Sequence, residues 1–302
     1  MKHSMGKVVM LALVACLTMA LCGCASQPYT PKQKESTVDS SALIKAGTLT
    51  VGVNAMSAPF AMESNGSISG IDVDTAAALA DQMGLKLEIV DVGTDATGAL
   101  EAGTVDVVMG LDSADTTLSC WVSDPYITSC VALFAQTSNS TIPTKKSKPS
   151  IAAEASSMSA WVVTSQFGAD ALNPQDISSA MEKLNSGEVT YVAADAVIGT
   201  YAINASKYNG HIVALMEKLS GFCIGASSTN TALQSAIQTA LSNYSNQGVS
   251  DVVEARWLGQ NLDLSTCSFT EGATDAKSNS DTGSSKEKES GVSGVGSNAV
   301  TF

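Results

Sequence analysis

The sequence predicts an α/β fold in which mostly parallel sheets are flanked by helices. Between residues 47 and 109, short segments with the pattern of strands alternate with runs of strong helix formers, and the links between them are short. A fainter repeat of this order follows residue 150. Ligands of such folds bind beyond the carboxyl ends of the strands, which points here to residues 54–60 and 110–117.

The first half opens with a strand, because Leu49, Val51 and Val53 alternate with small or polar residues. Gly84 ends the following helix, since glycine readily adopts the left-handed conformation of a helix C-cap. In chain order we expect a strand ending near 54, a helix from about 74 to 83, a strand over 85–89, a short helix ending at 103 and a buried strand over 105–109.

The second half repeats this pattern less clearly. Asp176 is a favourable N-cap for a helix that stops at Gly187. Leu233, Ile237 and Leu241 share one helix face at four-residue spacing. The other expected elements are strands over 131–135, 151–153, 190–195, 211–215 and 221–225, and helices over 157–167, 198–204 and 248–259.

Residues 1–24 are predicted to be a targeting segment that is removed from the mature protein. A head with two lysines precedes an apolar run over 8–20, which is shorter than the roughly 20 residues of a transmembrane helix. The run ends in LCGC, which resembles a bacterial lipobox, so we expect lipid on Cys24 and an anchor without a membrane span. The alternative is an ordinary secretory signal with incidental cysteines.

Two flanking segments have the composition of unstructured chain. Residues 25–41 contain two prolines and several polar residues but few large apolar ones, which is typical of a flexible tether. Residues 268–302 are dominated by Ser, Gly, Asp, Lys and Glu, and we expect a disordered tail.

The charge balance narrows the choice of partners. The chain has 29 acidic and 16 basic residues, a formal net charge of −13, which repels polyanions and argues against a nucleic acid partner. His211 is the one histidine outside the leader, and no Cys-x-x-Cys pattern occurs. The sequence therefore predicts neither a metal site nor a cofactor.

Five motifs follow one another through the first half of the chain. They are GTLTVG from Gly47, Pro59-Phe60, GIDVDTAAALA from Gly70, ALEAGTVD from Ala99 and SDPY from Ser123. In this order and spacing the sequence resembles family 3 of the bacterial extracellular solute-binding proteins, the amino-acid-binding class that serves ABC importers. The resemblance extends to about Gly259.

The resemblance implies a two-lobed fold of the type II periplasmic-binding-protein kind. Lobe 1 would comprise residues 42–136 and 224–264, lobe 2 residues 137–223, with two hinge crossings and closure around the ligand. It also implies a monomer on the outer face of the cytoplasmic membrane, held there only by its lipid anchor. Such a protein delivers a small polar ligand, an amino acid or an amine, to an ABC transporter permease.

The same resemblance assigns nine residues to the ligand: Phe60, Gly110, Asp112, Ser113, Thr116, Thr117, Ser156, Ser157 and Asp195. In such proteins the aromatic residue stacks on the ligand, the aspartate of the second lobe pairs with its ammonium group, and hydroxyl groups hold its carboxylate. The alternatives are a core phenylalanine at Phe60, a helix N-cap at Asp195, and serines that only cap a helix.

The arginine that grips the ligand carboxylate in typical members is missing. Its place falls on Thr116 or Thr117, and the chain's one arginine, Arg256, lies in the expected terminal helix. Asp112 and Asp115 add negative charge instead. A cleft without a positive clamp favours a cation over a zwitterion, so we expect an amine-like ligand, or an amino acid or short peptide held through backbone amides alone.

Four cysteines lie outside the targeting segment, and export permits disulfides. Of the three ways to pair them, we expect Cys120 with Cys130 and Cys223 with Cys267. Buried free thiols are the alternative.

Two other classes of function compete with import. One is a sensor or receptor of the same fold without transport, which the missing arginine favours. The other is an enzyme such as a dehydratase, since relatives of this fold include one, but no residue pair in the sequence suits a base and an acid. We therefore expect a binding protein and not an enzyme.

Overall fold

The structure is a computed structural model that describes residues 34–276. The predicted targeting segment, its lipidation site Cys24, the first part of the tether and the tail beyond residue 276 lie outside the described residues. Within residues 34–276, no helix combines the length and the apolar character that crossing a membrane requires.

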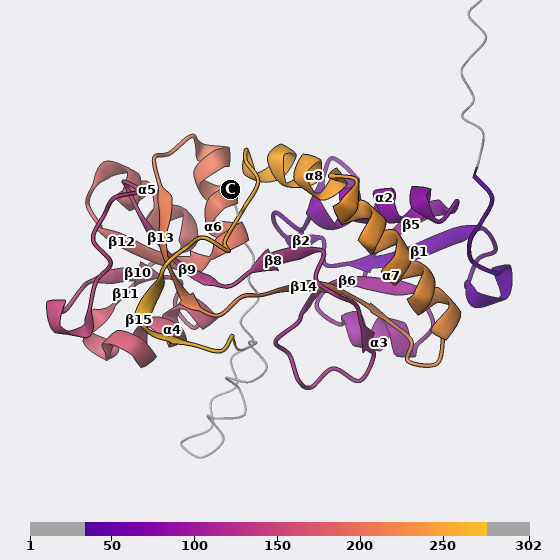
Figure 1. Cartoon of the computed structure of the whole chain (residues 1–302), viewed down its shortest axis with the longest axis horizontal. Coiled ribbons are helices and arrows are strands. Elements are labelled where there is room, and N and C mark those ends of the chain that lie inside the picture. Colours follow the sequence, from indigo (N-terminus) through magenta and orange to yellow (C-terminus); the bar gives the residue numbers. More distant parts are fainter. Residues whose placement is uncertain (1–33, 277–302) are drawn as a thin grey trace, which may run out of the picture. The chain divides into compact units, whose positions relative to one another are not determined.

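Six strands form the first sheet (Figure 1), in which five follow the order β5-β1-β6-β14-β7. β1 (Thr48–Val53) is parallel to β5 (Lys86–Asp91) and β6 (Val107–Asp112), which confirms the three strands predicted there. β14 (Ser220–Ala226) returns antiparallel to β6 and also pairs with the short strands β7 (Trp121–Val122) and β8 (Ile127–Ser129).

Helices cover both faces of this sheet (Figure 1). α2 (Ile71–Gln82), α7 (Thr231–Asn246) and α8 (Val249–Leu258) pack on one face, and α3 (Ala96–Glu101) packs on the other. Side chains of β6 alternate accordingly: Val107 and Met109 join the core under α2, whereas Val108 joins the core under α3. Burial on both faces explains why β6 starts as a continuous apolar run.

α2 begins earlier than its predicted start near residue 74. Its N-cap, Gly70, has a φ of 151°, and a Cβ there would lie 2.0 Å from the carbonyl oxygen of Phe60. Only glycine fits so close to another backbone. The Asp72 amide donates to that same oxygen (2.9 Å), so the first turn of α2 is docked on the loop after β1.

A small antiparallel sheet follows β1, which the sequence pattern did not predict. It consists of β2 (Met56–Ser57), β3 (Ala61–Ser64) and β4 (Ser67–Ser69). Phe60 lies in the turn between β2 and β3, where its amide donates to the carbonyl oxygen of Ser57 (2.8 Å). The small sheet therefore holds Phe60 in place beside the end of β1.

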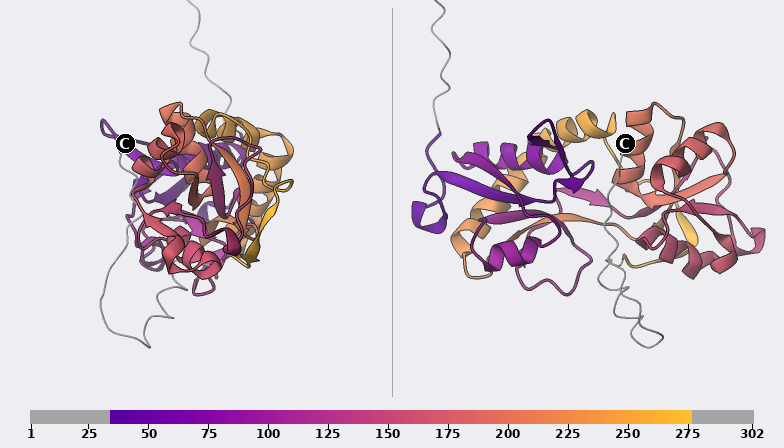
Figure 2. Two further views of the ribbon diagram at one scale, coloured as in Figure 1. Left: turned by 90° about the vertical axis from the view of Figure 1, so that its left-hand side faces the viewer. Right: turned by 180° about the vertical axis from the view of Figure 1, so that it is seen from behind.

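The second sheet, which Figure 2 also shows from behind, has the strand order β11-β10-β12-β9-β13-β15. Its strands are β9 (Val131–Ala135), β10 (Ile151–Ala153), β11 (Leu172–Pro174), β12 (Tyr191–Asp195), β13 (His211–Glu217) and β15 (Phe269–Thr274). α5 (Ile177–Ser186) and α6 (Ala196–Ser206) cover one face, and α4 (Met158–Phe167) covers the other. Three short 3-10 turns, η1 (Ser40–Ala42), η2 (Lys145–Ser147) and η3 (Ala169–Ala171), complete the described elements.

Both hinge crossings lie earlier in the chain than predicted. β8 belongs to the first sheet, since Ser129 pairs with Ser220, but β9 belongs to the second, since Val131 pairs with Asp195. The chain therefore crosses at Cys130, not near residue 137. It returns between β13 and β14, at Lys218–Leu219, and not at residue 223.

A third crossing lies between α8 and the predicted tail, and it moves Leu264, which was predicted in lobe 1, to the second lobe. Residues after α8 pass to the second sheet, where Leu264 is buried in the core and β15 pairs parallel with β13. The Leu215 amide donates to the carbonyl oxygen of Ser268 (2.8 Å), and the Lys218 amide donates to that of Thr274 (2.8 Å). The prediction of disorder from residue 268 was wrong up to 274, because backbone pairing does not depend on the polar composition.

The predicted tether is also shorter than expected at its carboxyl end. The Thr37 amide donates to the carbonyl oxygen of Met83 (3.0 Å), and Val38 is buried in the first core. Residues 37–41 thus pack against the first lobe.

The third crossing predicts a measurable loss of stability on truncation. Removing residues 260–302 would leave β13 as an unpaired edge and expose the core around Leu264. Burial of one leucine contributes about 1.5–3 kcal/mol, and about 1 kcal/mol shifts the Tm of a protein of this size by roughly 2–4 °C. We expect residues 25–259 to melt about 5 °C or more below residues 25–302 in calorimetry. Equal melting temperatures would contradict a structural role for β15.

Candidate ligand-binding cleft

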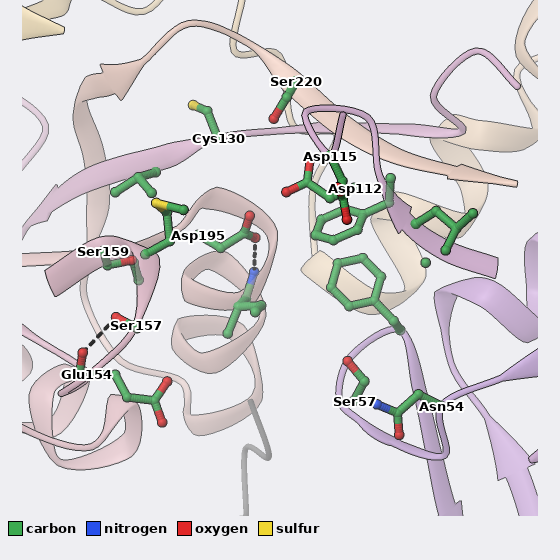
Figure 3. A pocket seen from close by; sticks show the side chains of 18 of the residues that line it. Asn54, Ser57, Asp112, Asp115, Cys130, Glu154, Ser157, Ser159, Asp195 and Ser220 are labelled. Atoms are coloured by element: carbon green, nitrogen blue, oxygen red, sulfur yellow. Dashed lines mark hydrogen bonds between the residues drawn. The ribbon is translucent and has the colours of Figure 1, made fainter. Parts of the chain in front are cut away.

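A cavity of about 490 Å³ lies between residues of the first and second sheets. Its walls come largely from segments that follow the carboxyl ends of parallel strands, as the fold rule predicts. On the first lobe these are the residues after β1 and the end of β6. On the second lobe they are the end of β12 and the residues before α4. Figure 3 shows the cleft from close by.

Five of the nine predicted ligand residues line this cleft: Phe60, Gly110, Asp112, Ser157 and Asp195. The other four, Ser113, Thr116, Thr117 and Ser156, are exposed and do not line it. Asp115 lines the cleft and also stabilises the loop in which it lies. Its carboxylate accepts hydrogen bonds from the amide (2.8 Å) and the hydroxyl (2.6 Å) of Thr117. Thr117, one of the two positions at which the arginine is missing, therefore lies in a turn that is held by the side chain of Asp115.

An aromatic pair forms part of the first-lobe wall. The ring of Phe60 lies 4.2 Å from that of Phe222 on β14, at an interplanar angle of 50°. Phe60 is only 4% exposed and belongs to the core, yet it also lines the cleft. Phe60 is therefore a core residue, and its place in the cleft lining leaves stacking on the ligand as a prediction.

A β-bulge turns the backbone of Gly110 toward the cleft. Gly110 has a φ of 79°, and the pairing of β6 with β14 shifts register between Val108 and Leu111. A glycine in the left-handed region is the usual residue of such a bulge. The carboxylate of Asp72 lies 3.4 Å from where a Cβ on Gly110 would be, so the bulge and this carboxylate face each other.

Asp72 is a site residue that the sequence analysis did not assign. It lies in the first turn of α2, is 2% exposed, lines the cleft and accepts a hydrogen bond from the hydroxyl of Tyr126. Burial raises the pKa of Asp72 to about 7, although the Tyr126 hydrogen bond acts in the opposite direction. One feature of the sequence could have indicated Asp72: it lies two residues after Gly70, at the start of a helix that follows a strand.

Asp195 both caps a helix and lines the cleft. Its Oδ1 accepts from the amides of Val197 (2.9 Å) and Ile198 (3.1 Å) at the start of α6 (Figure 3). Its Oδ2 accepts from the hydroxyl of Ser129 (2.6 Å), the last residue of β8 before the hinge. Burial raises the pKa of Asp195 to about 6 against these hydrogen bonds, and the negative charge of Asp112 adds to the rise.

Carboxylates dominate the cleft. Six line it: Asp72, Asp112, Asp115, Glu154, Asp195 and Glu217. No lysine, arginine or histidine is among the described residues that line it. Arg256 lies on α8, where it pairs with Asp74 (3.1 Å). Glu154 and Glu217 were also missed, because a lone glutamate at a strand end carries no local signal.

The N-termini of the cleft-lining helices on the second lobe already have acceptors. Ser157 caps α4 by accepting from the amide of Ala160 (3.1 Å), and its own hydroxyl donates to the carbonyl oxygen of Glu154 (2.6 Å). Asp195 caps α6 in the same way. The capping alternative for Ser157 therefore holds, although Ser157 also lines the cleft.

The four predicted disulfide cysteines are free thiols in the structure, which corrects the expected pairing. Cys120 packs on the α3 face of the first sheet, whereas Cys130 is buried in the core of the second, so their sequence proximity does not bring them together. Burial raises the pKa of all four thiols, which makes them weak nucleophiles. Residues 34–276 contain no group of three or more His, Cys, Asp or Glu side chains placed to hold a metal ion.

Two sheets flanked by helices, with a ligand-sized cleft between their strand ends, define a two-lobed α/β binding protein of the type II periplasmic-binding-protein kind. The model of the bacterial extracellular solute-binding proteins, family 3, matches residues 49–260, and the chain belongs to this family. Both the predicted family and the predicted fold are confirmed.

Solved structures with this fold are distant in sequence. The L-cystine solute receptor of Neisseria gonorrhoeae, in its unliganded open conformation, is 20% identical with a TM-score of 0.61, covering 72% of this chain and 95% of that one. An ancestral cationic amino acid solute-binding protein is 22% identical with a TM-score of 0.59, covering 70% and 96%. A histidine-bound substrate-binding protein from Streptococcus pneumoniae is 19% identical with a TM-score of 0.52, covering 72% and 95%. Among curated proteins, none matches this chain significantly.

The raised pKa values of Asp72 and Asp195 predict how the stability of the ligand-free protein changes with pH. Both values lie above the ordinary 3.8, so between about pH 4 and 7 the folded protein binds more protons than the unfolded chain. The free energy of unfolding should therefore fall as the pH rises, on the order of 3 kcal/mol between pH 5 and 8.

Urea unfolding at pH 5, 6, 7 and 8 measures this change. Asp72→Asn should flatten the pH dependence, whereas Asp81→Asn, an exposed position on the same helix, should leave it unchanged. A stability that rises from pH 5 to 8 in the wild type would contradict the buried state of the two carboxylates.

Proposed function

We propose that the protein is a lipid-anchored, extracytoplasmic solute-binding protein that delivers a small organic cation to the permease of an ABC importer. Its family supports the binding role, and the LCGC end of the targeting segment supports the anchor at Cys24. The ligand binds between the lobes as a free small molecule, and the protein acts as a monomer and not as an enzyme.

The acidic lining of the cleft carries this proposal. Six carboxylates line one cavity, and no lysine, arginine or histidine is among the described residues that line it with them. A ligand carboxylate placed there would be repelled at low dielectric, while an ammonium or guanidinium group would be attracted. A cation also compensates Asp72 and Asp195, whose ionised forms are disfavoured by burial.

The aromatic pair suits the same ligand. The ring faces of Phe60 and Phe222 offer an apolar surface for the carbon chain of an amine, and an aromatic face attracts a cation. Cationic ligands also occur with this fold: the arginine-, lysine- and histidine-binding protein of Geobacillus stearothermophilus has a TM-score of 0.50 to this chain.

A ligand screen tests the proposed specificity. Residues 25–302 are heated with agmatine, L-arginine, short alkylamines, L-glutamine and L-glutamate, each at a high concentration. A ligand at a hundredfold excess over its Kd stabilises by about 2.7 kcal/mol, so cations should raise the Tm by several degrees. Stabilisation by L-glutamate or L-glutamine alone would contradict the proposal.

A matched pair of variants then places the cation in the cleft. Asp112→Asn should weaken the best cation at least tenfold in calorimetric titration, because a hydrogen bond to a charged group contributes about 1.5–3 kcal/mol. Asp81→Asn removes the same charge from the exposed surface and should leave the Kd unchanged. Equal effects of the two variants would point to general charge attraction and not to the cleft.

The anchor is tested independently of the ligand. In a bacterial host, we expect the full chain to incorporate radiolabelled palmitate and to sediment with membranes. Cys24→Ser should abolish both, whereas Cys22→Ser should abolish neither, because only Cys24 follows the small and aliphatic pair of the lipobox. Labelling that survives Cys24→Ser would overturn the anchor.

A further inference from the structure

A hydrogen bond joins the two lobes directly at the first hinge crossing. Ser129 is the last residue of β8 in the first sheet, and its hydroxyl donates to the Oδ2 of Asp195, the last residue of β12 in the second sheet (2.6 Å). Cys130 follows Ser129, and its carbonyl oxygen accepts from the amide of Ala196 (2.9 Å). The start of α6 is therefore attached to the hinge strand by a side chain before the crossing and by the backbone at it.

Ser129 is itself held firmly in the first lobe. Its backbone pairs with Ser220 of β14, its carbonyl oxygen accepts from the hydroxyl of Ser220 (3.3 Å), and it is only 2% exposed. The hydroxyl therefore reaches Asp195 from a fixed position. Because Ser129 lies next to the crossing, a rotation of the lobes about the hinge displaces it little, and the hydrogen bond can persist while the cleft closes.

The hydrogen bonds of Asp195 leave room for one more donor. Each carboxylate oxygen offers roughly two acceptor positions. Oδ1 accepts from the amides of Val197 and Ile198, whereas Oδ2 accepts from Ser129. Figure 3 shows one carboxylate oxygen of Asp195 turned to α6 and the other turned away from this helix. A position on Oδ2 thus remains at the cavity that Asp195 lines.

Hydrogen bonds are what favour the ionised form of Asp195. Burial raises its pKa to about 6 and the negative charge of Asp112 on β6 adds to the rise, while the bonds from Ser129 and the two amides oppose it. The other neighbouring titratable group is Cys130, whose own pKa is raised by burial, by Asp195 and by Glu217 on β13, so its thiol stays neutral. No group in this set is positive.

From this arrangement we infer that Ser129 is a positioning residue of the ligand site, whose hydroxyl fixes the Asp195 carboxylate from the first lobe and leaves one acceptor position on Oδ2 for a cationic group of the ligand. The inference rests on the proposed function and names the residue that prepares its second-lobe carboxylate. Ser129 does not line the cavity, so its effect on the ligand passes through Asp195.

Titration of the ligand-free protein tests the first step. In residues 25–302 with carbon-13-labelled aspartate, the carboxyl carbon of Asp195, assigned through Asp195→Asn, reports its ionisation by NMR. Ser129→Ala should raise the midpoint by about one pH unit, because the ionised form loses a hydrogen bond. Thr128→Ala removes an exposed hydroxyl from the same strand and should leave the midpoint unchanged. An unchanged midpoint in Ser129→Ala would overturn the inference.

Calorimetric titration with agmatine and with L-arginine at pH 6 and pH 8 tests the second step. A cation at Asp195 needs the ionised carboxylate, and Ser129→Ala retains less of it at pH 6. Each unit of pKa changes the ionised fraction by up to about tenfold. We therefore expect the loss of affinity from pH 8 to pH 6 to be at least threefold larger in Ser129→Ala than in the wild type. Ser129→Thr keeps the hydroxyl and should retain the wild-type pH dependence.

The outcomes separate this inference from the function on which it rests. A melting curve first verifies that each variant is folded. An equal loss of affinity at both pH values in Ser129→Ala would indicate a general effect on the fold, which would overturn the inference and leave a cation-binding protein. If neither cation bound to the unmodified chain, the proposed function would fail, and the inference would fail with it.

Discussion

The pairing of β14 with β6 and β8 is the interaction on which the cleft depends. It brings a late segment of the chain back into the first sheet, next to the strand that ends in Asp112. The register of this pairing places Phe222 against Phe60 and forms the bulge at Gly110. It also fixes β8, whose last residue, Ser129, donates to Asp195 of the second lobe. One antiparallel strand thus positions the aromatic wall, the bulge and the hinge.

The electrostatic character of the cleft follows from the way that its helices begin. In many α/β proteins, free helix amides beside a binding site attract anions. Here the side chains of Ser157 and Asp195 accept amides at the starts of α4 and α6, and Asp72 adds a carboxylate in the first turn of α2. Two of these three are carboxylates, so the helix ends hold negative charge toward the cavity. This arrangement of the helix ends is the electrostatic basis of the cationic ligand that we propose.

Local sequence patterns were sufficient for most of the fold but for only part of the site. Alternation and apolar runs predicted β1, β5 and β6, because burial on a sheet acts on neighbouring residues. The same patterns could not place β9, since its buried run, VALFA, suits either sheet and the choice depends on distant partners. Asp72 and Glu217 were missed for a related reason: their role comes from tertiary burial, which leaves no mark within a few residues.

The third crossing affects the order in which the protein can acquire its structure during synthesis. The first lobe needs β14, α7 and α8, and the second needs β15, which comes after all three. The first hydrophobic core is therefore complete only when the chain has been made to Leu258, the second only at Leu264, and the second sheet gains its last strand at Thr274. Pairing between segments that lie far apart in the sequence slows folding, because these segments must meet before the hydrophobic cores can form. Both lobes thus become able to complete their cores at nearly the same point of synthesis, which suits the export that we propose, because a chain without a finished core stays thin enough for a narrow channel.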